Sequence, residues 1–559
     1  MTKSIFGLFI VVLLVNGCKK SDGDAGTNPP PPAATPISFT GGKINTTAAS
    51  LTAVNYNAAV NAAFRLTFNN KVDRTTIAPA VTITENAAGS VAYNISYENG
   101  DSTVVLATGS PLKYLTKYTI SGSTSIKAAN GRVLTSGFSF NFLTRIDSSR
   151  KFPSLTDDAL LTKIQEQTFK YFWDFAHPVS GLSRERNTSG DVVTSGGSGF
   201  GIMAIPVGVN RGFITRAQGL QRMQTIVGFL KNTAVKVKGA FPHWLNGATG
   251  AIVPFSANDN GADLVETSYL MMGLLTVRQY FNTADPAEAS LRADINTLYN
   301  NVEWDWFRNG GQNVLYWHYS PTVAWAMNLQ LRGWNEGLIT YIMAASSTTH
   351  GIPAAVYTNG WKASAGYANG NTYYGYQLPL GPPQGGPLFL AHYTFLGVNP
   401  NSLTEGGVNF FTQNKNHTLI NYNYCKANPA GYFGYSDSTW GLTASDIENG
   451  YTASSPTNDV GVIAPTAAIS SMPYTPAESM AALKFYYYVL GDKLWKEYGF
   501  VDAFSLSKPW IASSFLAIDQ GPIILMIENH RSGLLWNLFT SCPEVKAGML
   551  SLGFSAPYL

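Results

Sequence analysis

The pattern of hydrophobic and polar residues divides the chain into two long stretches with different periods. Between residues 37 and 145 apolar and polar residues alternate, most clearly at 64–68 and 138–142. A period of two predicts β-strands with one buried face. Asn-Gly pairs at 99–100 and 130–131 are hairpin-turn signals between such strands. Roughly seven short strands over this length predict a β-sandwich.

Beyond residue 154 the apolar residues take the spacing of helices. Thr156, Asp157 and Asp158 form a helix-start signal ahead of a run of buried-type residues. Long loops rich in Gly, Tyr, Trp and Asn separate the helical runs. Many helices with aromatic loops collected at one end are typical of an α/α toroid, so residues 154–559 are predicted to form a mostly α domain. The further helical runs are at 216–237, 262–282, 287–300, 335–347, 386–397, 475–490 and 522–529.

The N-terminus has the pattern of an exported lipoprotein. Lys3 precedes an apolar stretch at 5–15 that is too short to span a bilayer, and Leu-Val-Asn-Gly-Cys at 14–18 resembles a lipobox. We therefore expect a signal peptide at 1–17, lipidation of Cys18, and a Pro-rich tether at 18–36. The predicted location is the cell envelope, on the periplasmic face or the surface of the outer membrane. The alternative is an ordinary signal peptide followed by a chance cysteine.

Composition narrows the class of ligand. Charged residues are 13% of the chain, against about 25% in ordinary domains, and the net charge is only +3. No basic run extends beyond Lys19 and Lys20, which argues against a nucleic-acid partner. Uncharged polar residues mixed with Trp and Tyr suit sugars, because aromatic faces stack on pyranose rings while amides and hydroxyls bind their OH groups. Cys425 and Cys542 are expected to be buried and free.

Common cofactor and nucleophile motifs are missing or misleading in the sequence. Residues 199–204 fit GxGxxA, but no convincing strand precedes them, so a Gly-rich loop is the prediction rather than a dinucleotide site. The 7 histidines are scattered without HExxH, and GxSxG does not occur. No metal or cofactor is expected.

Three carboxylates are spaced to meet on one helix. Asp259, Asp263 and Glu266 lie at i, i+4 and i+7, and share a face if the helix of 262–282 reaches back to Asp259. The other faces are apolar, so these side chains require a polar cavity, where mutual repulsion raises at least one pKa. A general acid at neutral pH needs such a raised pKa. The alternative is that they merely stabilise a helix N-terminus.

A fourth carboxylate, Glu336, follows Trp334 and Asn335 at the predicted start of another helix. In one interpretation Asn335 caps the helix and Glu336 interacts favourably with its dipole. In the other, Glu336 faces the first three carboxylates across a cleft. The pattern alone leaves both open.

Taken together, these motifs resemble those of glycoside hydrolase family 144, the glucoamylase-like domain. They are Asp259-x3-Asp263-x2-Glu266, the Gly-Trp-Asn-Glu of 333–336, Gly-Gly-Pro-Leu-Phe at 385–389 with His392-Tyr393, and Asp-Gln-Gly-Pro at 519–522. The resemblance covers about 155–555. It implies an (α/α)6 toroid that hydrolyses β-1,2-glucan with inversion and without a metal, by an endo or an exo action. The segment 37–145 resembles bacterial Ig-like domains, and we expect it to be a spacer.

An inverting hydrolase needs one carboxyl group as acid and another as base. Glu336 is assigned as the acid, and Asp259 or Asp263 as the base or water-positioning group, with Glu266 beside them. A monomer is expected. The alternatives are a non-catalytic glycan-binding lipoprotein and a hydrolase of a different glucan. The candidate residues for sugar subsites are His243, Trp244, Trp317, His318, Trp334, Tyr376 and His392.

The lipobox generates the first testable prediction. Cys18→Ser should move the protein from the membrane fraction to the soluble fraction, because the acyl chains that hold it are attached to that thiol. Fractionation and mass spectrometry of the N-terminal peptide measure this. A wild-type protein that is already soluble and unacylated would show that the anchor does not exist.

Overall fold

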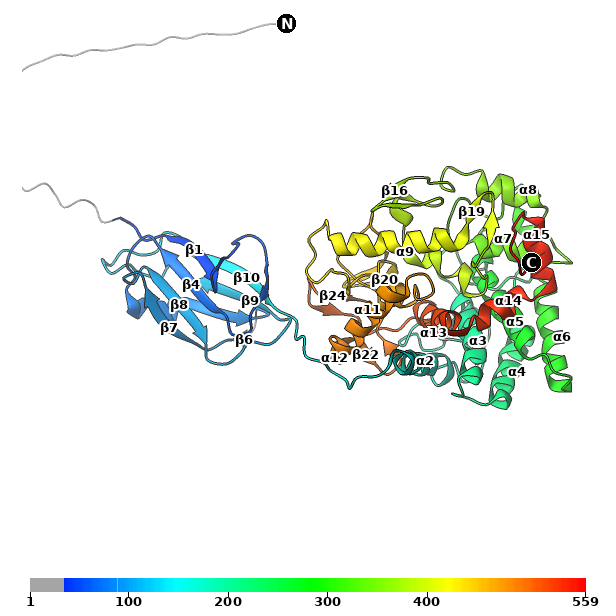
Figure 1. Ribbon diagram of the computed structural model, residues 1–559, viewed down its shortest axis with the longest axis horizontal. Helices are drawn as coiled ribbons and strands as arrows, with labels where there is room; N and C mark the ends of the chain where they lie inside the picture. The colour runs from blue at the N-terminus through cyan, green and yellow to red at the C-terminus, as the bar shows by residue number, and fades with distance from the viewer. Residues whose placement is uncertain (1–34, 88) are drawn as a thin grey trace, which may run out of the picture. The chain divides into compact units, whose positions relative to one another are not determined.

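The structure, a computed structural model, describes residues 35–87 and 89–559. The predicted signal peptide, Cys18 and nearly all of the tether therefore lie outside the described residues. The chain divides after Thr144 into two compact units, drawn in blue and in cyan to red in Figure 1.

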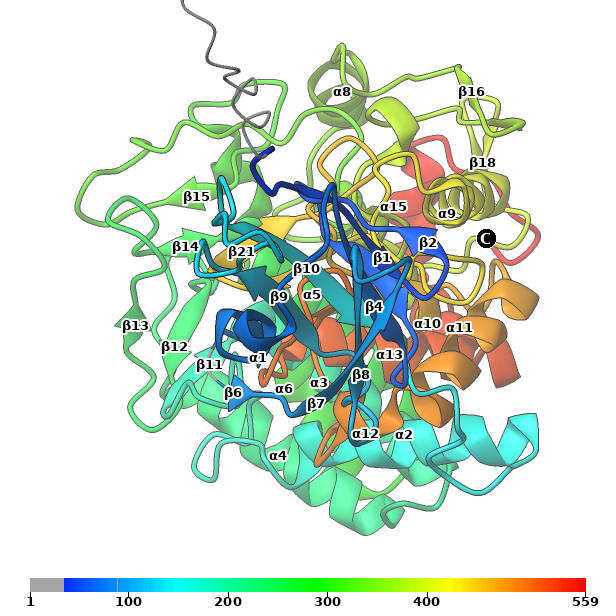
Figure 2. The same cartoon turned by 90° about the vertical axis from the view of Figure 1, so that its left-hand side faces the viewer.

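The first unit is a β-sandwich. Alternation produces it directly: in Ala63–Phe68 every second residue is buried. Phe64 and Leu66 from one sheet meet Phe140 and Phe142 from the other in a single apolar core. Strands of both sheets are visible in Figure 2. One sheet has the order β2 (Thr47–Ala48), β1 (Phe39–Ile44), β4 (Ala63–Phe68), β8 (Thr103–Thr108), β7 (Tyr93–Glu98), and the other β3 (Asn55–Ala58), β10 (Phe138–Thr144), β9 (Lys117–Gly122), β5 (Val81–Glu85), β6 (Gly89–Ser90).

The predicted hairpin turn between β7 and β8 is confirmed. Glu98 pairs with Thr103, so the connection has four residues, and Asn99, Gly100 and Asp101 have φ of 54°, 63° and 69°, the left-handed conformation that Asn, Asp and Gly adopt most readily. All strand pairs in the two sheets are antiparallel except β3 with β10.

The second unit, residues 145–559, is rich in helices. Its N-terminal segment packs on the helical unit before the first helix begins: the Lys151 N–H donates to the Tyr488 carbonyl, and Phe152 lies 4.6 Å from the ring of Tyr487. The longer helices are α2 (Asp157–Trp173), α3 (Ser195–Asn210), α4 (Arg216–Asn232), α5 (Leu264–Tyr280), α6 (Pro286–Asn300), α7 (Leu338–Ser346), α9 (Phe410–Ala427), α11 (Pro476–Tyr488), α13 (Ala517–Ser532), α14 (Leu534–Thr540) and α15 (Pro543–Ser551).

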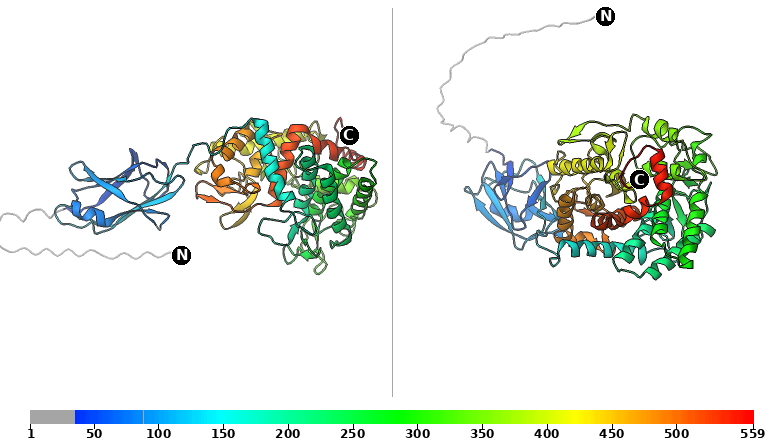
Figure 3. Two further views of the ribbon diagram at one scale, coloured as in Figure 1. Left: turned by 90° about the horizontal axis from the view of Figure 1, so that it is seen from below. Right: turned by 45° about the vertical axis from the view of Figure 1, so that its right-hand side comes forward.

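Helices buried on nearly all sides lie next to helices with one exposed face. α3, α5 and most of α13 are buried, whereas α2, α4 and α6 alternate buried and exposed positions. α3 packs against both α5 and α13, and α2 packs on α13. The last pair is visible in the left panel of Figure 3 as a cyan helix beside a red one. Within the described residues, no helix combines the length and hydropathy needed to cross a bilayer.

The prediction of a Gly-rich loop at 199–204 is wrong, because this segment lies within α3. Glycines disfavour helix by about 1 kcal/mol each relative to Ala. Here they allow two backbones to touch: a Cβ on Gly199 would stand 2.3 Å from the Tyr269 carbonyl oxygen, and one on Gly273 would stand 2.3 Å from that of Gly199. Close packing of α3 on α5 outweighs the weak local propensity.

The prediction of a helix at 386–397 is also wrong. Two short 3₁₀ turns, Leu388–Ala391 and Thr394–Leu396, take its place. Pro387 begins the segment and Gly397 ends it, and most of the backbone bonds between them are of the i to i+3 kind, with one i to i+4 bond from the Tyr393 N–H to the Phe389 carbonyl. Cys425 and Cys542 are buried and free, as predicted.

Candidate active site

The first carboxylate cluster is built at the start of α5. The helix begins at Leu264 and does not reach back to Asp259, so the predicted shared helix face is wrong. Asp263 is instead the N-cap, and its Oδ1 accepts from the N–H groups of Val265 at 3.0 Å and Glu266 at 2.9 Å. These bonds satisfy two of the free donors at the helix start and fix the Asp263 carboxylate in place.

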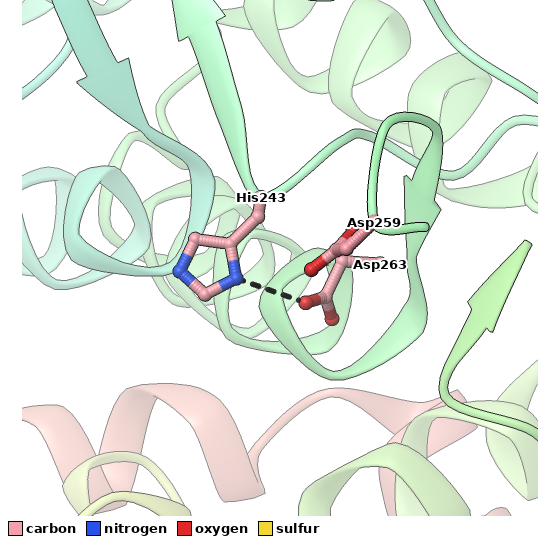
Figure 4. Close-up of side chains that lie close together, drawn as sticks. All are labelled: His243, Asp259 and Asp263. Carbon is pink, nitrogen blue, oxygen red and sulfur yellow. Dashed lines mark hydrogen bonds and ion pairs between the residues drawn. The ribbon is translucent and has the colours of Figure 1, made fainter. Parts of the chain in front are cut away.

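Two histidines join Asp259 and Asp263. A short antiparallel pair, β14 (Ala262–Asp263) with β15 (His318–Tyr319), sets Asp263 opposite His318. His318 Nε2 lies 3.4 Å from Asp259 Oδ2 and 3.5 Å from Asp263 Oδ2. From the other side, His243 Nδ1 lies 3.1 Å from Asp263 Oδ2, as Figure 4 shows. A local turn and a strand pair, rather than helix periodicity, therefore bring these groups together.

The protonation state of each of these aspartates and histidines depends on the charges of the others. Burial opposes ionisation of Asp263, but its hydrogen bonds with His243 and His318 and their charges hold the pKa of this carboxyl well below its usual range. Burial likewise lowers the pKa of His243, but the charge of Glu266 and the bond to Asp263 outweigh it and raise the pKa to about 9. Burial, and then the charge of Asp263, raise the pKa of Asp259. At neutral pH Asp263 is thus a carboxylate held by imidazolium.

Glu266 connects α5 to the start of α3. Its Oε2 accepts from the Gly196 N–H at 2.6 Å and from Thr194 Oγ1 at 3.3 Å. An anionic side chain is favoured at a helix N-terminus. Burial nevertheless raises the pKa of Glu266, although the charge of His243 opposes the rise.

Glu336 lies in the turn before α7. Asn335 Oδ1 accepts from the Gly337 N–H at 2.9 Å and so closes this turn. The helix begins at Leu338, and its N-cap is Gly337 rather than Asn335. The Tyr269 hydroxyl donates to the Glu336 carbonyl at 3.3 Å and so ties the turn to α5. Burial, with a further contribution from the charges of Asp263 and Glu266, raises the pKa of the Glu336 side chain to about 7.

Glu266 and Glu336 both line a cavity of about 460 Å³. His243, Trp244 and Trp317, predicted as subsite residues, line it too. The sequence analysis missed other aromatic residues of its wall. Phe255 is half exposed and stacks on the His243 ring at 4.2 Å, and Tyr451 is half exposed on the wall formed by the hairpin β20 (Ala444–Ile447) and β21 (Gly450–Ala453). Neither has a local pattern that distinguishes it from a loop aromatic.

The other predicted subsite residues do not line this cavity. His318 is buried against Asp259 and Asp263. Trp334 is buried against Phe410. Tyr376 belongs to the hairpin of β16 (Thr372–Tyr373) and β17 (Tyr376–Gln377). His392 is buried with Nε2 2.9 Å from Ser471 Oγ, and burial lowers its pKa to about 3, so it is a neutral core histidine.

A second carboxylate cluster lies at the hairpin that carries Tyr451, and the sequence analysis named only its Asp519, within the motif at 519–522. Arg186 Nη1 lies 3.2 Å from Asp446 Oδ2, and the Asp446 N–H donates to Asp502 Oδ2 at 2.7 Å. Burial raises the pKa of Asp502 to about 7 and, together with the charge of Asp502, holds the pKa of Asp519 well above its usual range. Arg186, Asp446 and Asp502 are more than fifty positions apart, and Asp519 follows Asp502 after 17 positions on a different element, so no periodicity reveals the cluster.

A helical domain whose cavity gathers carboxylates and aromatic rings has the construction of a helix-rich glycoside hydrolase. The comparisons with known proteins agree with this class. Residues 328–543 match a family model described as "Putative glucoamylase", and residues 43–144 match the bacterial Ig-like domain model. The chain belongs to the glucoamylase-like family of glycoside hydrolase family 144 type, with an N-terminal Ig-like domain.

Three relatives illustrate the membership. An endo-β-1,2-glucanase from Chitinophaga pinensis, solved with sophorotriose and glucose, is 50% identical over 73% of this chain and 100% of its own, with a TM-score of 0.71. A β-1,2-glucanase from Parabacteroides distasonis is 37% identical over 93% of this chain and 74% of its own, with a TM-score of 0.70. An exo β-1,2-glucooligosaccharide sophorohydrolase from the same organism is 46% identical over 72% of this chain, and the match spans 58% of that relative's length.

The contact of Glu266 with α3 generates the second prediction. Gly196→Ala should destabilise the helical unit by about 2–4 kcal/mol, because the new Cβ would stand 2.4 Å from Glu266 Oε2 and disturb a buried hydrogen bond. Urea unfolding measures this. Gly228→Ala in α4 is the control: its Cβ meets nothing within 4 Å, so the change should be neutral or slightly stabilising. Equal stability of the two variants would show that Glu266 is not held at the start of α3.

Proposed function

We propose that this protein hydrolyses β-1,2-glucan with inversion at the anomeric carbon, using carboxyl groups alone for both proton transfers, on an (α/α)6 toroid. The observation that carries the proposal is Glu336: a carboxyl group on the cavity wall whose pKa of about 7 keeps much of it protonated at neutral pH. The names of the relatives, β-1,2-glucanase and sophorohydrolase, support the substrate class.

Glu336 is the proposed general acid. It donates its proton to the glycosidic oxygen as the bond to the anomeric carbon breaks, which the raised pKa makes possible. Once the proton has left, the Glu336 carboxylate stands near Asp263 and Glu266, whose charges favour its reprotonation before the next turnover.

The Asp259 and Asp263 pair is the proposed base. Asp263 is held as a carboxylate by two histidines. Both aspartates are buried next to His243 and do not line the cavity themselves, so the proposal needs a water that reaches Asp259 Oδ1, which has no hydrogen-bond partner among the described residues. Inversion places this water on the side of the sugar ring opposite the acid, with the two carboxyl groups about 6.5–9.5 Å apart. The cluster of Asp446, Asp502 and Asp519 is the alternative source of the base.

The aromatic walls support binding of a neutral sugar chain. Trp244, Phe255 and Trp317 lie on the side of His243, and Tyr451 lies on the hairpin wall. Stacking of their rings on pyranose faces, with nearby polar groups for the hydroxyls, would hold glucose units without charge. A protein that only bound glucan would have no use for a protonated carboxyl group among three others.

In this proposal the remaining parts of the chain position the helical domain relative to the membrane. The Ig-like domain acts as a spacer, and the lipid on Cys18 holds the protein, as a monomer, at the outer membrane on its periplasmic face or at the cell surface. The lipobox and the Pro-rich tether at 18–36 support the anchor.

The third prediction concerns products and variants. Purified protein should cleave linear β-1,2-glucan to sophorose or other short β-1,2-oligosaccharides, with the α-anomer appearing first in NMR spectra recorded during the reaction. Glu336→Gln should lower kcat by about 100-fold or more, because the acid is lost. Glu497→Gln, a change at an exposed surface carboxylate, is the control and should leave kcat unchanged.

Variants of the two clusters then locate the base. Asp259→Asn and Asp263→Asn should lower kcat by about 100-fold or more if the base lies in this pair. Full activity in both, with a loss in Asp502→Asn or Asp519→Asn, would assign the base to the second cluster. First formation of the β-anomer would contradict inversion, and binding of glucan without turnover would make the protein a glycan-binding lipoprotein.

The fourth prediction concerns pH. Since the protonated form of Glu336 is the active one, kcat/KM should be retained below about pH 7 and fall by about tenfold per unit above it. Asp263, with its lowered pKa, should remain ionised across this range. The residual activity of Glu336→Gln should lack the alkaline limb. If kcat/KM of Glu336→Gln still fell above about pH 7, the titrating group would be one other than Glu336.

A further inference from the structure

We infer that His243, Asp259 and Asp263 form a binding site for a divalent transition-metal ion. One ligand atom from each of these residues lies within 4.8 Å of the other two. Figure 4 shows the imidazole and the two carboxylates turned toward a common space. Bonds of about 2.0–2.2 Å to nitrogen and oxygen would require the side chains to draw together around the ion, because two such bonds span at most about 4.4 Å.

An unsatisfied oxygen points to the same ligand. Asp259 Oδ1 is buried and has no hydrogen-bond partner among the described residues, and the whole residue is only 4% exposed. Buried polar atoms in folded proteins nearly always have a partner, which can be a side chain, a water or an ion, so this oxygen is available to a bound water or a cation. In Figure 4 the carboxylate of Asp259 lies on the side that faces His243. A cation there would give this oxygen the partner it lacks.

The surroundings hold the three ligands in place. Asp263 Oδ1 is fixed by two N–H groups at the start of α5, which leaves Oδ2 directed at His243. His318 Nε2 lies close to the Oδ2 atoms of both aspartates and bridges them. The ring of Phe255 covers His243. Supporting groups of this kind orient metal ligands and strengthen binding.

The ligand set defines the kind of ion. One imidazole nitrogen with two carboxylate oxygens suits Zn²⁺ and Mn²⁺ better than Ca²⁺ or Mg²⁺, which favour oxygen alone. Three protein ligands leave at least one position open, and since only His243 of the three lines the cavity, that position would be filled by water. Binding would replace the proton between His243 Nδ1 and Asp263 Oδ2, which passes to solvent.

The site has a consequence that rests on the proposed function. If Asp259 and Asp263 supply the base, an ion bound to their oxygens removes them from proton transfer. Zn²⁺ should then inhibit glucan hydrolysis, and a chelator should restore it. The same residues could then either bind the metal ion or take part in hydrolysis, but not both at once.

The test is isothermal titration calorimetry, in which ZnCl₂ is titrated into the tag-free chain at pH 7.5 in the absence of glucan. One ion per chain should bind in the micromolar range. His243→Gln and Asp259→Asn should each weaken binding by at least about tenfold. The matched control is His350→Ala: His350 Nδ1 lies 3.1 Å from Asp305 Oδ1, the same distance as in the His243–Asp263 pair, but among the described residues no third His, Cys, Asp or Glu joins these two as a ligand. This variant should bind as the wild type does.

Three outcomes would overturn the inference: no stoichiometric binding of Zn²⁺ or Mn²⁺ below about 1 mM, unchanged binding in Asp259→Asn with its fold intact by circular dichroism, or an equal loss in His350→Ala. Crystals soaked in Zn²⁺ add a readout independent of stability, since anomalous scattering should place the ion about 2.0–2.2 Å from the three ligands. Calorimetry does not depend on turnover. A protein that hydrolyses glucan but binds no zinc would refute only the metal site, and one that binds zinc without hydrolysing glucan would refute only the proposed function.

Discussion

The direct contact between the backbones of α3 and α5 is the constraint on which the site depends. Gly199 and Gly273 meet where any Cβ would collide with a carbonyl group of the other helix. At this separation the start of α3 comes within reach of Glu266, whose Oε2 accepts from the Gly196 N–H. A larger residue at these glycines would separate the helices, and Glu266 would then be a buried carboxylate without a donor, at a cost of several kcal/mol.

The same contact fixes the electrostatics of the cavity. Glu266 contributes to the raised pKa of His243, and Glu266 and Asp263 together add to the raised pKa of Glu336. Asp263 stays charged because two histidines bond to it, while Glu336 stays largely protonated because burial and neighbouring charges disfavour its anion. Environment, rather than residue type, separates the two roles, as it does wherever one site uses carboxyl groups as both acid and base.

Sequence patterns predicted the features that local chemistry determines. Alternation in 64–68 gave the strand, the Asn99-Gly100 pair gave the turn, and apolar spacing located α5 and α6 to within about two residues. Patterns failed where tertiary contact overrides propensity. The glycines of α3 weaken an isolated helix, and only the partner backbone explains them. Asp259 and Asp263 were grouped for the wrong reason, since a strand pair with His318 brings them together and not a helix face.

The residues that sequence reasoning missed share one property: each acquires its environment from distant parts of the chain. Asp446 and Asp502 come from a hairpin and a loop, and Arg186 comes from the segment before α3. They meet Asp519 of α13, which the sequence analysis named only within the motif at 519–522. Tyr451 and Phe255 are single aromatics in loops until the fold sets them on the cavity wall. By contrast His392, which has the family motif around it, lies in the core with Ser471 as its partner. A motif therefore locates a type of structure, whereas the chemistry of a side chain follows from what the fold places within a few ångströms of it.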